Sequence, residues 1–193
     1  MNVELELLTN EQIYERIMRM DIPRAQHSVL IATALVKQTI VEMGQGEYAP
    51  FMKLADGLIA RGIKIFLLLA GNPSRPFLSS LRTFRQSLRG LSIRICVRNH
   101  MKVVLVDGAK LYLGSANLTG AGMGHKDKNK RNFEFGFFTR DDRMIKRIGK
   151  IIEEIWERKY CGPCQVKRYC QQENERFGAA LQREEKLAIM EKR

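Results

Sequence analysis

The chain has 193 residues, 45% of them hydrophobic, which is typical of one soluble globular domain. Its 33 Lys and Arg residues outnumber the 21 Asp and Glu residues, and the resulting formal net charge of +12 favours an anionic partner, nucleic acid first and a membrane surface second. The longest apolar runs are too short to cross a bilayer, and the N-terminus lacks the pattern of a signal peptide. We therefore expect a cytoplasmic protein.

Apolar spacing and Gly or Pro breaks predict alternating helices and strands in the first half of the chain. Helices are expected over Leu7–Met20, Pro50–Arg61 and Phe77–Leu88, and strands over Ser28–Val36, Ile63–Leu69 and Ser92–Val97. Between them, Gln38–Ala49 contains Gly44 and Gly46 and indicates a helix start or a loop.

The second half begins with a hairpin over His100–Asn117 and a Gly-rich segment over Leu118–Gly124. A strand is expected over Phe133–Thr139, a helix over Arg143–Lys159, and a charged helical tail within Cys161–Arg193. Asp141 and Asp142 stand at the start of the long helix, where carboxylates interact favourably with its dipole. This alternation predicts an α/β fold with helices on both faces of a sheet.

The hairpin has Asp107-Gly108, a strong turn signal, between two apolar runs. A two-residue turn places His100 opposite Ser115, whereas a four-residue loop places Lys102 opposite Ser115 and His100 opposite Asn117. Because opposed residues share a face, both registers gather His100, Lys102, Ser115 and Asn117 on one side. Asp107 lies an odd number of residues from His100 and Lys102, so its side chain would point to the other face. We therefore expect a structural role for it at the turn.

The spacing His-x-Lys, four residues, Asp, six residues, Gly-Ser-x-Asn resembles the motif of the phospholipase D superfamily, the HKD phosphodiesterases. In this chain it comprises His100, Lys102, Asp107, Gly114, Ser115 and Asn117, and the resemblance covers roughly residues 10 to 160. It implies a mixed sheet sandwiched between helices in a catalytic domain over 1–160. A short extension with cysteines then covers 161–193.

The resemblance also implies a mechanism that needs no metal or other cofactor. In the family a neutral imidazole, here that of His100, attacks phosphorus and forms a phosphohistidine, and a second imidazolium protonates the leaving oxygen. Lys102 and Asn117 would hold the non-bridging oxygens, and Ser115 would orient the imidazole or a phosphate oxygen. Glu134, in the strand after the motif, would fix the imidazole tautomer.

The mechanism requires two imidazoles, but the complete motif occurs once. His27 and His125 are the other histidines, and neither lies in a His-x-Lys setting. Because the family's small single-motif nucleases pair two chains, the resemblance implies a homodimer with one active site on the two-fold axis.

Chain length, net charge and a basic loop favour nucleic acid as the substrate. These features do not distinguish DNA from RNA, and of the two we expect DNA. The loop follows the motif and contains Lys126, Lys128, Lys130 and Arg131 as candidate phosphate contacts. The prediction is therefore a metal-independent endonuclease. The alternatives are a lipid phosphodiesterase of the phospholipase D type and a catalytically silent module that binds nucleic acid.

Three cysteines follow the long helix. Cys161-Gly-Pro-Cys164 with Cys170 is consistent with a structural zinc or iron–sulfur site, with a redox or disulfide pair, or with unligated thiols. A fourth metal ligand would have to come from Cys96, His125 or a partner chain. Cys96 lies in a predicted core strand, so we expect it to be a buried structural thiol.

Overall fold

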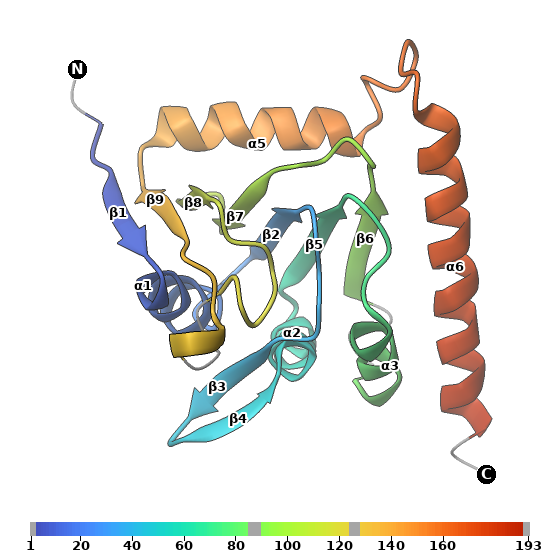
Figure 1. The fold of residues 1–193 in the computed structure, drawn as a ribbon, viewed down its shortest axis with the longest axis horizontal. Coiled ribbons are helices and arrows are strands. Elements are labelled where there is room, and N and C mark those ends of the chain that lie inside the picture. The colour runs from blue at the N-terminus through green and yellow to red at the C-terminus, as the bar shows by residue number, and fades with distance from the viewer. Residues whose placement is uncertain (1–2, 85–89, 124–127, 191–193) are drawn as a thin grey trace.

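The computed structural model describes residues 3–84, 90–123 and 128–190, and Figure 1 shows their arrangement. The strands are β1 (Glu6–Thr9), β2 (Ser28–Thr33), β3 (Ile40–Gly44), β4 (Glu47–Pro50), β5 (Lys64–Leu69), β6 (Leu91–Ile95), β7 (Lys102–Val106), β8 (Lys110–Gly114) and β9 (Phe135–Thr139). The helices are α1 (Glu11–Ile13), the π-helix η1 (Tyr14–Asp21), α2 (Phe51–Ala60), α3 (Arg75–Thr83), the short 3-10 helix η2 (Lys128–Lys130), α5 (Asp142–Trp156) and α6 (Lys167–Met190).

Seven strands form one mixed sheet in the order β1-β9-β8-β7-β2-β5-β6. Strands β2, β5 and β6 are parallel, and every other neighbouring pair in the sheet is antiparallel. The carboxyl ends of β2, β5, β6 and β8 therefore lie at the same edge of the sheet as the amino ends of β7 and β9. We call this edge the site edge.

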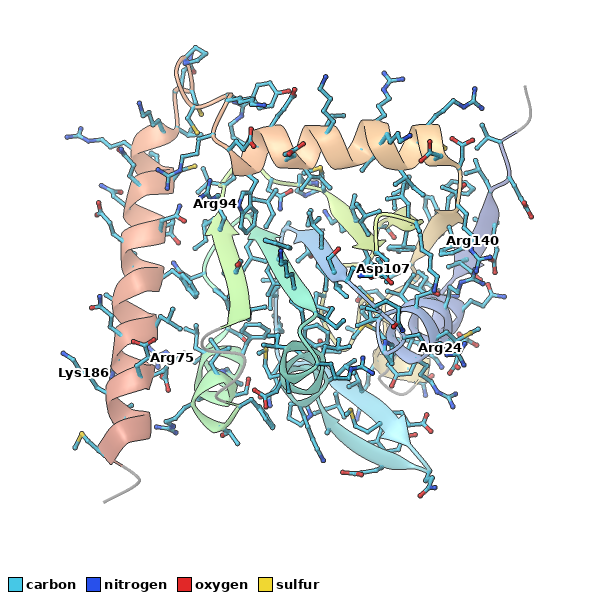
Figure 2. All side chains as sticks on the ribbon, turned by 180° about the vertical axis from the view of Figure 1, so that it is seen from behind. Arg24, Arg75, Arg94, Asp107, Arg140 and Lys186 are labelled. Carbon is cyan, nitrogen blue, oxygen red and sulfur yellow. The ribbon has the colours of Figure 1, made fainter. Side chains whose placement is uncertain are left out.

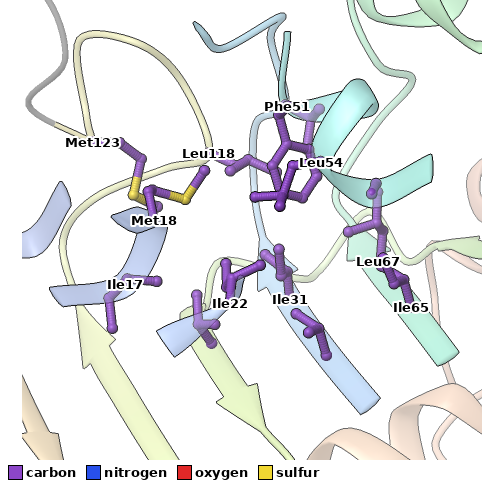
Figure 3. Close-up of a cluster of buried hydrophobic side chains, with 14 of the residues drawn as sticks. Ile17, Met18, Ile22, Ile31, Phe51, Leu54, Ile65, Leu67, Leu118 and Met123 are labelled. Atoms are coloured by element: carbon purple, nitrogen blue, oxygen red, sulfur yellow. The ribbon is translucent and has the colours of Figure 1, made fainter. Parts of the chain in front are cut away.

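Helices cover both faces of the sheet, as expected. On one face α5 buries Ile145 and Ile152 against sheet residues such as Leu68 and Leu111. On the other face a larger core joins η1 and α2 to the sheet, and Figure 3 shows part of it. Its labelled side chains are Ile17, Met18, Ile22, Ile31, Phe51, Leu54, Ile65, Leu67, Leu118 and Met123.

The long C-terminal helix α6 lies beside β6 and α3 (Figure 1). Its Phe177 is buried in the larger core, and Asn174 forms hydrogen bonds with both the backbone N–H and the carbonyl of Ile95. The expected helical tail is therefore present and packs on the sheet. The division of the chain into domains at residue 160 stays a prediction.

Two expectations for local structure were wrong. Residues Leu7–Met20 do not form one helix, because Glu6–Thr9 pairs with β9 as an edge strand before the helical turns begin. Gln38–Ala49 contains the hairpin β3–β4, whose turn has positive φ angles at Gln45 and Gly46. The last part of the helix expected over Phe77–Leu88 lies outside the described residues. In the described part of the chain, no helix is long and apolar enough to cross a membrane.

Candidate active site

The β7–β8 hairpin has a register that differs from both predicted ones. Asp107 and Gly108 form the turn with φ angles of 55° and 61°, and Ala109 N–H donates to the Val106 carbonyl at 3.0 Å. Val106 nevertheless pairs with Lys110, so Ala109 is one extra residue in the connection. Such a bulge shifts the pairing of β8 against β7 by one residue. Side chains that both predicted registers placed on the same face of the hairpin then lie on opposite faces. The polar groups of the motif are therefore not gathered by one strand face.

Their positions are instead set by the ends of several strands at the site edge. His100 and Lys102 lie at the amino end of β7, where Lys102 pairs with Thr33 of β2. Lys102 Nζ lies 3.2 Å from His100 Nδ1, 3.4 Å from His100 Nε2 and 3.0 Å from the His100 carbonyl oxygen. A lysine ammonium only donates, so it binds a ring nitrogen through the lone pair of that nitrogen. That lone pair is the one a nucleophilic imidazole uses.

Asn117 is held by the end of β2. Its Oδ1 accepts hydrogen bonds from Thr33 Oγ1 and from the Leu35 backbone N–H, both at 3.1 Å. Because Thr33 is the β2 partner of Lys102, these contacts place Asn117 next to the His100–Lys102 pair. With its oxygen occupied in this way, the amide can present its N–H groups to a ligand.

Ser115 and Glu134 form a hydrogen-bonded pair between the end of β8 and the start of β9. Ser115 Oγ donates to Glu134 Oε2, Phe135 N–H donates to Ser115 Oγ at 3.2 Å, and Asn132 Nδ2 donates to Glu134 Oε1 at 3.0 Å. Glu134 is buried, so these donors compensate its lost hydration. Within the described residues, no hydrogen bond joins Glu134 to His100, so the tautomer-fixing contact implied by the resemblance stays a prediction.

Two opposed glycines shape this part of the site. Gly114 pairs with Gly136, and the buried Tyr112 side chain lies over both. A Cβ added to Gly114 would lie 2.5 Å from Tyr112 Oη and 2.6 Å from the Phe135 carbonyl oxygen. Burial raises the pKa of Tyr112 to about 12, so this phenol stays neutral. The glycine before Ser115 is therefore required by packing.

Asp107 lies at the opposite end of β7 from His100. The five residues of β7 separate them by roughly 17 Å, at about 3.4 Å per residue. The Asp107 carboxylate accepts backbone N–H groups of Gln26, His27 and Ser28 at 2.7–3.1 Å. Partial burial opposes ionisation, but these donors outweigh it and hold the pKa of Asp107 below its usual value. Its contacts join the hairpin turn to the start of β2.

Sequence reasoning missed Asn99, which holds the loop that carries His100. Asn99 is 4% exposed, and its Nδ2 donates to the carbonyls of Leu68 at 2.7 Å and Thr33 at 3.2 Å. Its Oδ1 accepts the Met101 N–H at 3.1 Å. These bonds attach the loop to the carboxyl ends of β2 and β5. The position of an Asn directly before the motif histidine was the one signal in the sequence.

The basic loop is only partly described. Lys126 lies outside the described residues, as does the side chain of Lys128, and Lys130 is exposed. Arg131 Nη1 forms an ion pair with Glu11 Oε2 at 3.0 Å, and the arginine side chain is only 14% exposed. This ion pair joins the loop to α1, and the role of Arg131 as a phosphate contact stays a prediction.

The cysteines are all free thiols. In residues 3–84, 90–123 and 128–190, no group of three or more Cys, His, Asp or Glu side chains is positioned to hold a metal ion. The structure therefore does not support the three-cysteine metal site expected at Cys161, Cys164 and Cys170. Cys96 is also not a fully buried core thiol, because it lies just after β6 and is half-buried. His125, another candidate ligand, lies outside the described residues.

Solved structures with a similar fold include two bacterial proteins and an archaeal one. NucT from Helicobacter pylori matches with a TM-score of 0.58 and 16% identity, over 81% of this chain and 97% of that one. Nuc from Salmonella typhimurium, a phospholipase D family member, matches with a TM-score of 0.56 and 17% identity over 80% and 95%. TrmBL2, an archaeal chromatin protein with a novel mode of DNA binding, matches with a TM-score of 0.52 and 15% identity over 80% and 52%.

Sequence comparisons give a consistent result. No curated protein matches the chain. The sequence profile of a family described as "Cardiolipin synthase, PLD-like domain" matches residues 18–156, from η1 to the end of α5, and includes the whole site edge. Because the matched region covers well over half of the chain, the chain belongs to this family of the phospholipase D-like phosphodiesterase superfamily.

Proposed function

We propose that this protein is a metal-independent endonuclease that hydrolyses nucleic-acid phosphodiester bonds, DNA rather than RNA, through a phosphohistidine intermediate. The observation that carries the proposal is the pairing of His100 with Lys102 beside Asn117, at the sheet edge that also bears Ser115 and Glu134. These groups supply a nucleophile, a fixed cation, an amide donor and a buried carboxylate. Together they are what an in-line attack on a phosphodiester requires.

Each group has a distinct part in the proposed reaction. A ring nitrogen of His100 attacks phosphorus, and the bond to the leaving oxygen breaks as that oxygen takes a proton from a second imidazolium. Lys102 Nζ and Asn117 Nδ2 stabilise the charge that builds on the non-bridging oxygens. Water then cleaves the phosphohistidine, assisted by the second imidazole acting as a base. The Ser115–Glu134 pair orients the nucleophile from the side of β9.

The second imidazole comes from a second copy of the chain, because one chain contains a single complete motif. Two aromatic side chains next to Glu134 support an interface here, since Phe133 is 97% exposed and Phe135 is 59% exposed. Large apolar groups exposed together favour association. In the proposed homodimer they pack around one active site on the two-fold axis.

The dimer is tested by subunit mixing as well as by light scattering. Wild-type chains exchanged with an equal amount of inactive His100→Ala chains form mixed dimers. If one site needs both imidazoles, the activity per total chain falls to about one quarter. A fall to about one half, or a fully active monomer, would contradict the shared site.

The reaction is tested with labelled DNA, labelled RNA and phosphatidylcholine vesicles, all in the presence of EDTA. We expect DNA cleavage that His100→Ala reduces by at least ~1,000-fold. The matched control is His27→Ala, because His27 contacts Asp107 through its backbone N–H. We expect this variant to retain activity. A covalent adduct between wild-type chain and labelled strand, stable in alkali and labile in acid, is the expected signature of phosphohistidine.

The alternatives predict different results in the same assays. Hydrolysis of the vesicles alone would identify a lipid phosphodiesterase and overturn the nuclease proposal. If both the wild-type protein and His100→Ala bind DNA and neither cleaves it, the protein is a silent binding module. What favours nucleic acid is the net charge of +12 of the whole sequence, and not a row of basic side chains located on the structure.

A further inference from the structure

A cavity of about 350 Å³ lies beside His100 at the site edge. It is formed where the carboxyl end of β6 and the loop 96–101 meet the end of α5 and the first turns of α6. Figure 2 labels Arg94, one of its lining residues, at the end of β6 near the junction of α5 and α6. Its volume is within the range of about 300–1,000 Å³ that is typical of small-molecule sites. Because His100 also lines it, a group held in the cavity would adjoin the nucleophile of the proposed reaction.

The charge around the cavity is positive. The wall contains Arg94, Arg98, Arg158 and Lys167, and its described lining residues include no carboxylate. Burial lowers the pKa of Arg94, and the like charge of Arg158 lowers it further. Arg98 Nη1 donates to Cys164 Sγ at 3.7 Å, which leaves the other N–H groups of this guanidinium for a ligand. Cations that gather without acids favour an anion, and a phosphate matches the paired N–H donors of a guanidinium.

Another part of the wall is apolar and aromatic. It contains Met101, Ile151 and Ile155, together with Tyr160. Tyr160 is 49% exposed, and its hydroxyl donates to Glu154, which holds the ring in place. An accessible aromatic ring beside cations is the arrangement on which unpaired bases stack. The cavity therefore offers contacts for both a phosphate and a base.

The cavity depends on a part of the chain that follows the family match. That match ends at residue 156, and the lining residues Arg158, Tyr160 and Lys167 come after it. In the sheet, β6 and β9 lie on opposite sides of β7. The cavity beside β6 is thus on the side away from Phe133 and Phe135, the proposed dimer contacts. A second copy of the chain that packs on these aromatics need not cover the cavity.

We propose that this cavity binds one unpaired nucleotide of a DNA strand, next to the scissile phosphate. The proposal rests on the proposed nuclease function and narrows its substrate to single strands and unpaired strand ends. Arg98, Arg158 and Lys167 bind the phosphate of that nucleotide, and its base stacks on Tyr160. A base inside the cavity cannot pair with a complementary strand, so fully paired DNA would have to open before it is cleaved.

The first test measures binding and does not depend on cleavage. An NMR titration of the full-length protein compares dAMP, deoxyribose phosphate and inorganic phosphate. We expect dAMP to bind at least ~5-fold more tightly than deoxyribose phosphate, because only dAMP has a base to stack. Equal affinities would show an anion pocket, and no binding at millimolar dAMP would show that there is no subsite; either result would overturn the proposal. Binding of dioctanoyl-phosphatidylglycerol without binding of dAMP would identify a lipid pocket and overturn it as well.

Two pairs of variants test the assigned residues. Tyr160→Ala should weaken the binding of dAMP at least ~5-fold without weakening that of phosphate, because it removes the stacking surface. Its control is Tyr169→Ala, since Tyr169 is an exposed residue of α6 outside the cavity. Arg158→Gln should weaken both ligands about 10-fold, whereas Arg168→Gln, at an exposed position of α6 outside the cavity, should weaken neither. Wild-type affinity for dAMP in both cavity variants, shown to be folded by circular dichroism, would overturn the proposal.

The last test uses DNA cleavage in the presence of EDTA. A single strand should be cleaved at least ~10-fold faster than the same strand when fully paired, because the paired base must first leave the duplex. In a single strand with one abasic position, cleavage should fall at the phosphate on one side of that position and continue on the other side. Equal cleavage of single and paired strands would overturn the subsite and leave the nuclease function intact. Binding of dAMP with the expected variant effects, but without any DNA cleavage, would support the nucleotide site and contradict the nuclease function.

Discussion

The glycine that precedes Ser115 offers a direct test of how the site is built. In Gly114→Ala, the new Cβ would lie 2.5 Å from Tyr112 Oη, 2.6 Å from the Phe135 carbonyl oxygen and 2.7 Å from Gly136 Cα. Two of these atoms belong to the backbone of β9 and cannot turn away as a flexible side chain would. β8 and β9 must therefore separate locally, or Tyr112 must leave its buried position.

The magnitude follows from two opposing effects. Inserting a methyl group into a well-packed region costs typically about 1–3 kcal/mol. Replacing glycine lowers the entropy of the unfolded chain and returns about 0.4–1 kcal/mol. We therefore expect a loss of about 1–2 kcal/mol in the free energy of unfolding. Activity should fall as well, because Ser115 follows directly and its N–H donates to the Phe135 carbonyl.

Urea denaturation with a matched variant measures this effect. Gly57→Ala is the control, because Gly57 lies within α2 and nothing is within 4 Å of its added Cβ. In a helix interior this change should stabilise by up to about 1 kcal/mol. The two variants should thus differ by about 2–3 kcal/mol. Equal stability of Gly114→Ala and Gly57→Ala would refute the packing argument.

Two further predictions concern hydrogen bonds that position the motif. Asp107→Asn should lower the free energy of unfolding by about 1–3 kcal/mol at pH 7, as followed by denaturation. Because folding lowers the pKa of Asp107, its contribution is present above the unfolded value of about 3.9 and is lost as pH falls through the folded value, so wild type and variant should converge in acid. Asn99→Asp should lower kcat with little change in KM, since a carboxylate cannot donate to the Leu68 and Thr33 carbonyls; an unchanged kcat would contradict its positioning role.

The sequence predicted the architecture well, because buried strands and amphipathic helices have clear periodicity. The register of the hairpin could not be predicted from the sequence. Asp107-Gly108 specifies a turn but does not indicate that Ala109 is an extra residue in the connection. The strand β1 was also missed, because its pairing with β9 is a contact between distant parts of the chain. Local patterns carry no information on which strand completes an edge.

In the candidate site, too, local sequence spacing identified residues, whereas contacts between distant parts of the chain could not be predicted. Spacing identified His100, Lys102 and Asn117, but their actual neighbours depend on Thr33 at the end of β2. The cysteines give a further example. Cys96 was expected to be a buried core thiol because its strand is apolar, yet it lies past the end of that strand and is only half-buried.

The loop 96–101 connects these observations. At its centre, Asn99 attaches it to the carboxyl ends of β2 and β5, and at its start Val97 N–H donates to Cys170 Sγ of α6. His100 follows Asn99 directly, so the loop that carries the nucleophile of the proposed reaction is held by both the sheet and the C-terminal helix. A family match that ends at residue 156 excludes α6, although α6 contacts this loop directly. Truncation before α6 should therefore affect the geometry of His100 even though no motif residue is removed.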